Sequence, residues 1–207
     1  MKTSSEGTLI HAFFSAGELA DNLLNSKLNY RARINANFHE LIREIYREIL
    51  EDYKIGEREY RSMKLSKSIL NEIKERIKYN YNLGLGKILH ELFGYENGTY
   101  IYERFYLYED KMHVIRGAPD RVFRNGNGEI TVEEFKTYRR ENVRYHQVLR
   151  GVVQLGIYGY LCQTENGRLV LLDVSNGILE MFYYSYPLTS QKKLIRDAID
   201  ASIKKLK

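Results

Sequence analysis

The fold expected for this chain follows from two short segments, Gly117-Ala118-Pro119-Asp120 and Val132-Glu133-Glu134-Phe135-Lys136. They lie in two predicted β-strands, 111–122 and 130–138, and Asn125-Gly126-Asn127-Gly128 between them is typical of a hairpin turn. Pro119 cannot continue a central ladder, so it marks the end of the first strand. We therefore expect the first segment to fold back beside the second.

The second segment carries a pair of ionisable side chains on one face. Glu134 and Lys136 are two residues apart, so on a strand they point to the same side, and Phe135 points to the core. The hairpin can bring Asp120 near Glu134. Two close carboxylates repel one another unless a cation lies between them. An isolated Glu-x-Lys would be read as a surface ion pair, but its combination with Pro-Asp and a turn favours a site.

The surrounding pattern predicts an α/β layered domain. Ser15 and Glu18 fit a capping box that opens a helix at Ala16, and helical spacing dominates to about Tyr95. We expect one structural domain with a helical N-terminal region at 1–95 and a core at 96–207. The core should contain strands and helices in this order: strands 100–108, 111–122 and 130–138, helix 145–163, strands 168–174 and 179–184, and helix 191–205.

A polar stripe follows the third predicted strand. His146, Arg150, Gln154 and Tyr158 recur every four residues on the predicted helix 145–163. A solvated face would explain the first two. Gln154 and Tyr158 lie inside an apolar run, where polar groups need partners.

These motifs resemble those of the PD-(D/E)XK nucleases. Pro119-Asp120, Glu134-x-Lys136 and Gln154-x-x-x-Tyr158 are similar to the RecB-type branch, which includes CRISPR-associated exonucleases and their relatives in archaeal viruses. That branch also has a histidine in a Gly-x-x-x-His setting, which Gly86-Lys87-Ile88-Leu89-His90 matches. The resemblance implies a restriction-endonuclease-like mixed sheet flanked by helices.

The resemblance also implies a role for each residue. His90, Asp120, Glu134 and the backbone carbonyl of Phe135 would hold the metal. Lys136 would align the attacking water and stabilise charge on the phosphate. Gln154 and Tyr158 would contact the DNA backbone or orient the site. Carboxylates suit Mg²⁺, and an imidazole ligand shifts the preference towards Mn²⁺.

Composition narrows the cofactors. The chain has 207 residues and one cysteine, Cys162, so it cannot form an internal disulfide or supply the four cysteines of an iron–sulfur cluster. Many CRISPR-associated relatives hold such a cluster, and functions tied to it do not carry over. A divalent cation, Mg²⁺ or Mn²⁺, is the inorganic cofactor that we expect.

The net charge of +5 permits a polyanionic partner without requiring one. Much of the basic excess follows the Glu134 strand, and we expect these residues to contact DNA phosphates: Arg139, Arg140, Arg144 and Arg150. We find no motif for reading base sequence, so we expect little base specificity.

The sequence thus predicts a metal-dependent deoxyribonuclease that prefers single-stranded DNA and acts as an exonuclease, with endonuclease activity also open. It would serve DNA replication, recombination or repair inside the cell, in the host cytoplasm if the source is a virus. We expect no association with a membrane. Replication or recombination proteins are candidate partners. Alternatives are a non-catalytic nucleic-acid binding protein, a structure-selective endonuclease or resolvase, and a calcium-binding module, because residues 123–134 imitate an EF-hand loop without its first ligand.

Overall fold

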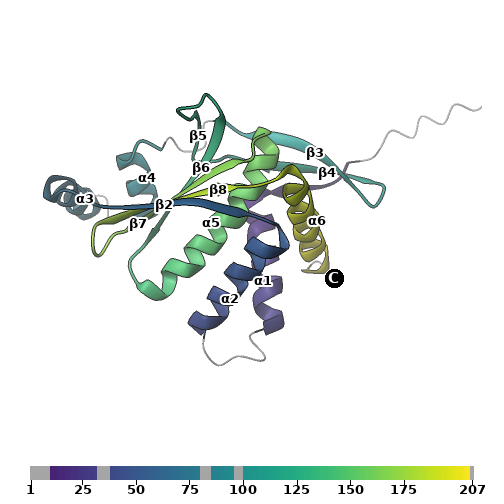
Figure 1. The fold of residues 1–207 in the computed structure, drawn as a ribbon, viewed down its shortest axis with the longest axis horizontal. Helices are drawn as coiled ribbons and strands as arrows, with labels where there is room; N and C mark the ends of the chain where they lie inside the picture. The colour runs from purple at the N-terminus through teal and green to yellow at the C-terminus, as the bar shows by residue number, and fades with distance from the viewer. Residues whose placement is uncertain (1–9, 32–37, 80–84, 96–99, 206–207) are drawn as a thin grey trace, which may run out of the picture.

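The structure is a computed structural model that describes residues 10–31, 38–79, 85–95 and 100–205. Fourteen elements follow one another in mixed order (Figure 1). They are β1 Ile10–Ser15, α1 Ala16–Arg31, α2 Phe38–Asp52, β2 Gly56–Lys64, α3 Lys67–Tyr79, α4 Leu85–Leu92, β3 Tyr102–Tyr108, β4 Lys111–Gly117, β5 Arg121–Arg124, β6 Ile130–Tyr138, α5 Glu141–Cys162, β7 Asn166–Asp173, β8 Ile178–Ser185 and α6 Leu188–Lys205.

A five-stranded sheet forms the centre, in the order β2-β8-β7-β6-β5. Only β6 and β7 are parallel, and α5 makes the crossover between them. Parallel neighbours need a long connection, which explains why a 22-residue helix separates these strands. The predicted mixed sheet flanked by helices is confirmed.

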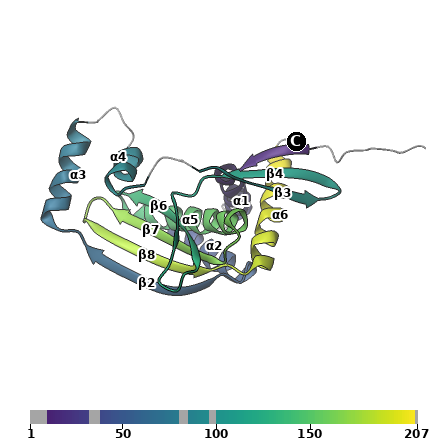
Figure 2. The same ribbon diagram turned by 90° about the horizontal axis from the view of Figure 1, so that it is seen from above.

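The helix α5 packs across one face of this sheet together with α1, α2 and α6 (Figure 1). The opposite face has a smaller core beneath α3 and α4, which lie together at one end of the molecule (Figure 2). Phe135 belongs to this smaller core, whereas Val132 belongs to the larger one. Alternate side chains of β6 therefore enter the two cores, because an apolar layer covers each face of the sheet at this strand.

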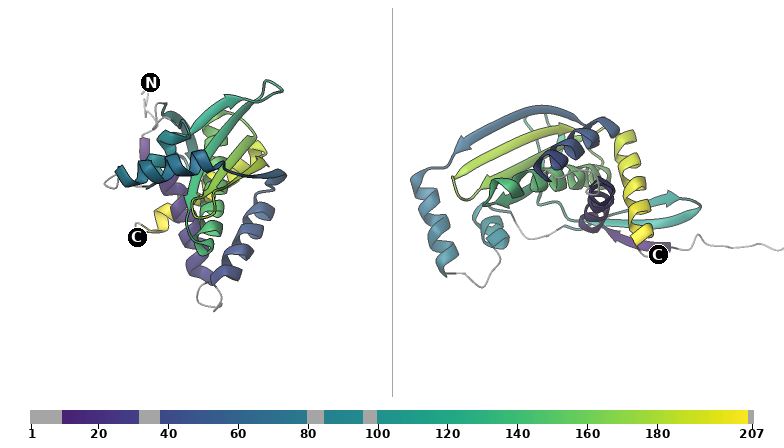
Figure 3. Two further views of the ribbon diagram at one scale, coloured as in Figure 1. Left: turned by 90° about the vertical axis from the view of Figure 1, so that its left-hand side faces the viewer. Right: turned by 90° about the horizontal axis from the view of Figure 1, so that it is seen from below.

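A second, three-stranded sheet has the order β1-β4-β3, with β1 parallel to β4. It projects from the other end of the molecule, away from α3 (Figure 3). The single strand predicted over 111–122 was wrong, because it is two strands in two sheets. Residues 118–120 carry the chain from β4 to β5, and the buried Pro119 offers no N–H with which to extend β4.

The described residues up to Tyr95 form α1, α2, α3 and α4, and they also supply β1 and β2. All nine residues of β2 are exposed, so this edge strand has no apolar alternation to reveal it. The predicted cap is present: the backbone N–H of Glu18 donates to Ser15 Oγ at 3.1 Å, and α1 begins at Ala16.

The turn at Asn125–Gly128 joins β5 to β6, as expected, and Gly128 takes the left-handed conformation that the turn requires (φ +78°). An EF-hand loop needs a helix on each side, and here both flanking elements are strands. The calcium-binding alternative therefore has no support from the fold. None of the helices within the described ranges is long and apolar enough to cross a bilayer.

Candidate active site

Side chains from three parts of the fold meet beside the middle of β6. His90 comes from α4, Asp120 from the connection between the two sheets, and Glu134 and Lys136 from β6 itself. The first pair lies close, with His90 Nδ1 at 3.5 Å from Asp120 Oδ1. The strand and turn pattern predicted the proximity of Asp120, Glu134 and Lys136, and the resemblance added His90. The structure brings all four together in space.

Asp120 is fixed by the backbone of β6. The N–H of Phe135 donates to Asp120 Oδ2 at 2.6 Å, which orients the carboxylate towards the strand that carries Glu134. A charge-assisted bond of this length is a strong one. Burial raises the pKa of Asp120, and the bond from Phe135 and the charge of Lys136 oppose that rise.

Gly117 allows the close packing behind this carboxylate. A Cβ at this position would stand 2.8 Å from Tyr158 Cε1 and 2.9 Å from both Ala16 Cβ and Leu161 Cδ1. The absent side chain thus lets β4 approach α1 and α5 closely. The connection that holds Asp120 begins directly after this glycine.

Glu134 is buried, with its side chain 5% exposed. Lys136 Nζ donates to its Oε1, while its Oε2 is buried and has no hydrogen-bond partner among the described residues. Burial raises the pKa of Glu134 to about 7, the charge of Asp120 adds to the rise, and Lys136 opposes it. One carboxylate oxygen therefore lacks a donor or a cation.

His90 packs among aromatic rings. Its ring centroid lies 5.3 Å from that of Phe135 and 5.6 Å from that of Tyr95, and Tyr95 itself stacks on Phe135 at 4.7 Å. Burial lowers the pKa of His90, and the negative charge of Glu134 only partly offsets this effect. The imidazole is therefore kept neutral, which is the form that binds metals.

Gln154 and Tyr158 lie on α5 beneath the carboxylates, each about 5% exposed. Burial raises the pKa of Tyr158, and the charges of Glu134 and Asp120 raise it further, so the phenol stays protonated. Gln154 interacts with this phenol, and its own Oε1 is buried without a hydrogen-bond partner among the described residues. Both side chains are within the site, but beneath its surface.

The donor set fits a hard divalent cation. The candidates are two carboxylates, a neutral imidazole and the carbonyl of Phe135, which are ligands of Mg²⁺ and Mn²⁺. In the conformation seen, no three His, Cys, Asp or Glu side chains in the described part of the chain already converge on one point. The buried, unpartnered Oε2 of Glu134 is the observation that favours a cation, since Lys136 satisfies only the other oxygen.

The four arginines expected at DNA fall into two groups. Arg139 and Arg140 are exposed between β6 and α5. Arg144 instead forms a two-pronged pair with the buried Glu180, and Arg150 pairs with Asp21 of α1 through bonds of 2.7 and 3.0 Å. Carboxylates distant in sequence hold both guanidinium groups, and the Arg144 side chain is 16% exposed whereas that of Arg150 is 33% exposed.

Sequence reasoning missed Glu133, whose side chain is completely buried beside the site. Arg168 pairs with its Oε2, and Arg121 Nη1 lies 3.4 Å from its Oε1. Tyr95 also interacts with this carboxylate. Glu133 and Glu134 are adjacent and point to opposite faces, and each has one buried carboxylate oxygen without a hydrogen-bond partner among the described residues. No signal in the sequence separates them except the spacing to Lys136.

The fold and this cluster together define a nuclease. The family model of the PD-(D/E)XK nuclease superfamily matches residues 1–205, and the chain belongs to that superfamily. Members of the superfamily act on nucleic acid and usually use Mg²⁺ or Mn²⁺. The single cysteine, Cys162, is half-buried and cannot supply an iron–sulfur cluster.

Two solved structures are similar to the chain. The crystal structure of SSO0001 is 22% identical, with a TM-score of 0.48, over 90% of this chain and 86% of its own. Rai1 of Scheffersomyces stipitis, in complex with (3′-NADP)⁺ and calcium ion, is 10% identical, with a TM-score of 0.35, over 95% of this chain and 60% of its own. Among curated proteins, no sequence matches the chain.

Proposed function

We propose that the protein is a metal-dependent deoxyribonuclease that prefers single-stranded DNA and degrades it as an exonuclease, with endonucleolytic cuts as a second activity. The observation that carries this proposal is the convergence of His90, Asp120, Glu134 and Lys136 around a buried carboxylate oxygen to which no described residue donates a hydrogen bond. Family membership supplies the nuclease class. DNA, the single-stranded preference and the exonuclease mode are the proposed refinements.

The metal would be held by His90, Asp120, Glu134 and the carbonyl oxygen of Phe135. When bound, it lowers the pKa of a water molecule and neutralises charge on the phosphate. The remaining work falls to the chain. Asp120 is kept in place by the Phe135 N–H, and the aromatic rings around His90 keep the imidazole neutral and oriented.

In this proposal the ammonium group of Lys136 has different partners without and with the metal. In the structure its ammonium group donates to Glu134 and so partly compensates the buried charge. Once a cation takes over that compensation, the ammonium group is available to hold the attacking water or a phosphate oxygen. Lysine suits this exchange because its ammonium group is a compact charge on a flexible stem.

Gln154 and Tyr158 act in this proposal as positioning residues. Their burial beneath the carboxylates favours orientation of the site over contact with the DNA backbone. Arg139 and Arg140 are exposed and remain the proposed phosphate contacts, whereas Arg144 and Arg150 stabilise the fold through Glu180 and Asp21. An intracellular role in DNA replication, recombination or repair, alongside proteins of those processes, stays part of the proposal.

The test is digestion of end-labelled single-stranded, double-stranded and circular DNA, with Mg²⁺, Mn²⁺ or a chelator. We expect cleavage that needs metal, favours single strands and is at least 100-fold slower, as an order of magnitude, in Asp120→Ala and Lys136→Ala. Lys111→Ala is the matched control, because Lys111 is an exposed strand lysine at the far end of β4.

The substrate panel separates the alternatives. Cleavage of circular single strands would show that no end is needed and favours the endonuclease mode. Cutting only at junctions or branches would favour a resolvase. Binding of DNA without cleavage of any substrate would favour the non-catalytic binding protein and refute the proposal.

A further inference from the structure

A pocket of about 410 Å³ opens directly beside the candidate metal site. Asp120 forms part of its wall, together with Pro119 and Arg121 from the same connection. Two aromatic side chains also line it: Tyr102 is the first residue of β3 in the three-stranded sheet, and Tyr100 lies just before that strand. The pocket is therefore continuous with the residues that would hold the scissile phosphate, and its volume lies in the range of small-ligand sites.

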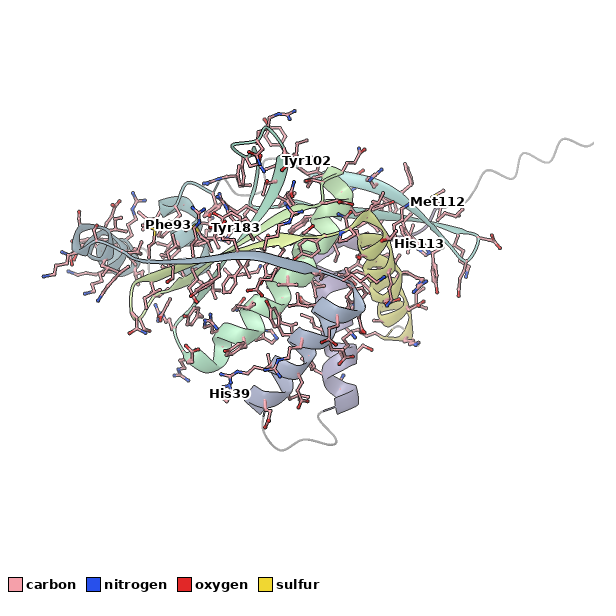
Figure 4. The ribbon with its side chains drawn as sticks, viewed as in Figure 1. His39, Phe93, Tyr102, Met112, His113 and Tyr183 are labelled. Atoms are coloured by element: carbon pink, nitrogen blue, oxygen red, sulfur yellow. The ribbon has the colours of Figure 1, made fainter. Side chains whose placement is uncertain are left out.

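The two tyrosines differ in how they are held. Tyr102 is half-buried at the start of β3, opposite Gly117, and packs against the large core. Tyr100 is 74% exposed, which is unusual for a ring of this size. Figure 4 shows Tyr102 near the β5–β6 hairpin and far from Met112 at the other end of the small sheet. An aromatic wall thus stands at the end of the small sheet that faces the site.

The opposite rim of the pocket carries a fixed positive charge. Arg121 Nη2 donates to the carbonyl oxygens of Phe93 and Gly94 at 3.2 and 3.4 Å, and the guanidinium group lies 4.5 Å from the centre of the Tyr95 ring. Its other end approaches the buried Glu133. The side chain is nonetheless 39% exposed, so a phosphate oxygen can reach it.

We propose that this pocket binds the nucleobase of a nucleotide next to the scissile phosphate, with the base stacked on Tyr100 and Tyr102 and its own phosphate near Arg121. This inference rests on the proposed nuclease function and names the substrate contact that gives it single-strand preference. A base and its phosphate are joined through one sugar, which matches a base pocket that shares Asp120 with the metal site.

The chemistry of the wall determines which substrate fits. Every nucleobase has a flat π-face, so stacking on tyrosine tolerates any sequence. A base inside a duplex is already stacked and paired, and taking it out costs a few kcal/mol. The pocket therefore selects single-stranded or frayed DNA without reading its sequence.

The experiment uses labelled single-stranded oligonucleotides with one abasic site at successive positions, digested with Mn²⁺. We expect the wild-type protein to lose about tenfold in cleavage rate at the phosphate at one fixed offset from the abasic site. Tyr100→Ala should cut normal DNA about tenfold more slowly at limiting substrate and show no additional effect of the abasic site. Tyr100→Phe, which keeps the ring, should retain the abasic effect that Tyr100→Ala loses.

Matched variants keep this test decisive. Phe105→Ala removes an equally exposed ring (62%) from β3 outside the pocket, and it should leave the abasic pattern unchanged. Tyr102→Leu tests the second ring with its packing partly retained. The inference is overturned if the abasic effect is absent in the wild type, or persists undiminished in both pocket variants. Cleavage of normal DNA by the wild type would still support the nuclease, whereas failure of all cleavage would refute both proposals.

Discussion

Replacing Glu134 by Gln should stabilise the metal-free protein while abolishing metal binding at the site. The reason is that burial raises the pKa of Glu134 from an ordinary value of 4.5 to about 7. An acid whose pKa is raised on folding costs stability when ionised. The cost is absent below about pH 4.5, grows as pH rises, and is complete above pH 7.

The size of the effect follows from the same shift. Each pKa unit corresponds to about 1.4 kcal/mol, so ionised Glu134 costs the metal-free protein about 3 kcal/mol at pH 8. The favourable effect of Lys136 is already contained in this shift, because Lys136 opposes the rise in pKa. The expected gain is therefore about 3 kcal/mol, or about 6–12 °C in Tm for a chain of this length.

Thermal unfolding of both proteins in chelator, at pH 5 and pH 8, measures this difference. We expect the variant to gain Tm at pH 8 and little at pH 5. Added Mg²⁺ or Mn²⁺ should raise the Tm of the wild type only. Glu103→Gln is the control, because Glu103 pairs with Arg116 on the surface, where the exposed side chain gives a small effect. An unchanged or lower Tm of Glu134→Gln at pH 8, or an equal gain at both pH values, would refute the reasoning.

Three further outcomes test other parts of the structure. Gly117→Ala should lose about 1–3 kcal/mol of unfolding free energy in denaturant titrations, because its Cβ would meet three atoms within 2.9 Å, whereas Gly126→Ala, with nothing within 4 Å, should change little. Arg144→Ala should lose about 3–5 kcal/mol, because it leaves the buried Glu180 unpaired. Burial opposes ionisation of Glu180, but hydrogen bonds from Arg144, Tyr60 and Tyr138 bring its pKa below the ordinary value. The stability that ionised Glu180 contributes is therefore present above about pH 4.5 and is lost as pH falls through the lowered pKa. The unfolding free energy measured from pH 3 to 7 should depend less on acid in Arg144→Ala than in the wild type. Burial raises the pKa of the Cys162 thiol to about 12, so a thiol reagent at pH 8 should label the folded protein far more slowly than the unfolded one, and equal rates would contradict the placement of this side chain.

The sequence was most informative where chemistry forces a local pattern. Asp120 and Glu134 could be paired from a proline, a turn and strand alternation, and the structure places both beside the Phe135 backbone. The same reasoning could not find β2, because all nine of its residues are exposed and give no apolar alternation, and its pairing with β8 joins residues far apart in the sequence.

The sequence also did not reveal which acidic residues pair with the arginines. Arg144 and Arg150 read as a basic run near the site, yet their carboxylates lie 36 and 129 residues away in sequence. A surface arginine and a paired arginine have the same local sequence signal, and only the folded chain distinguishes them. The roles of the site residues remain predictions until the variants above are measured.

The passage of the chain from one sheet to the other at residues 118–120 has a consequence for how this enzyme class can diversify. The carboxylates and the lysine are anchored to the five-stranded sheet, through the Phe135 N–H and β6 itself. Of the two pocket tyrosines, Tyr102 begins β3 of the three-stranded sheet and Tyr100 lies in the segment that leads into it. Substitutions in the smaller sheet can therefore remodel substrate choice while the hydrolytic machinery stays intact, so an engineer could exchange one module without rebuilding the other.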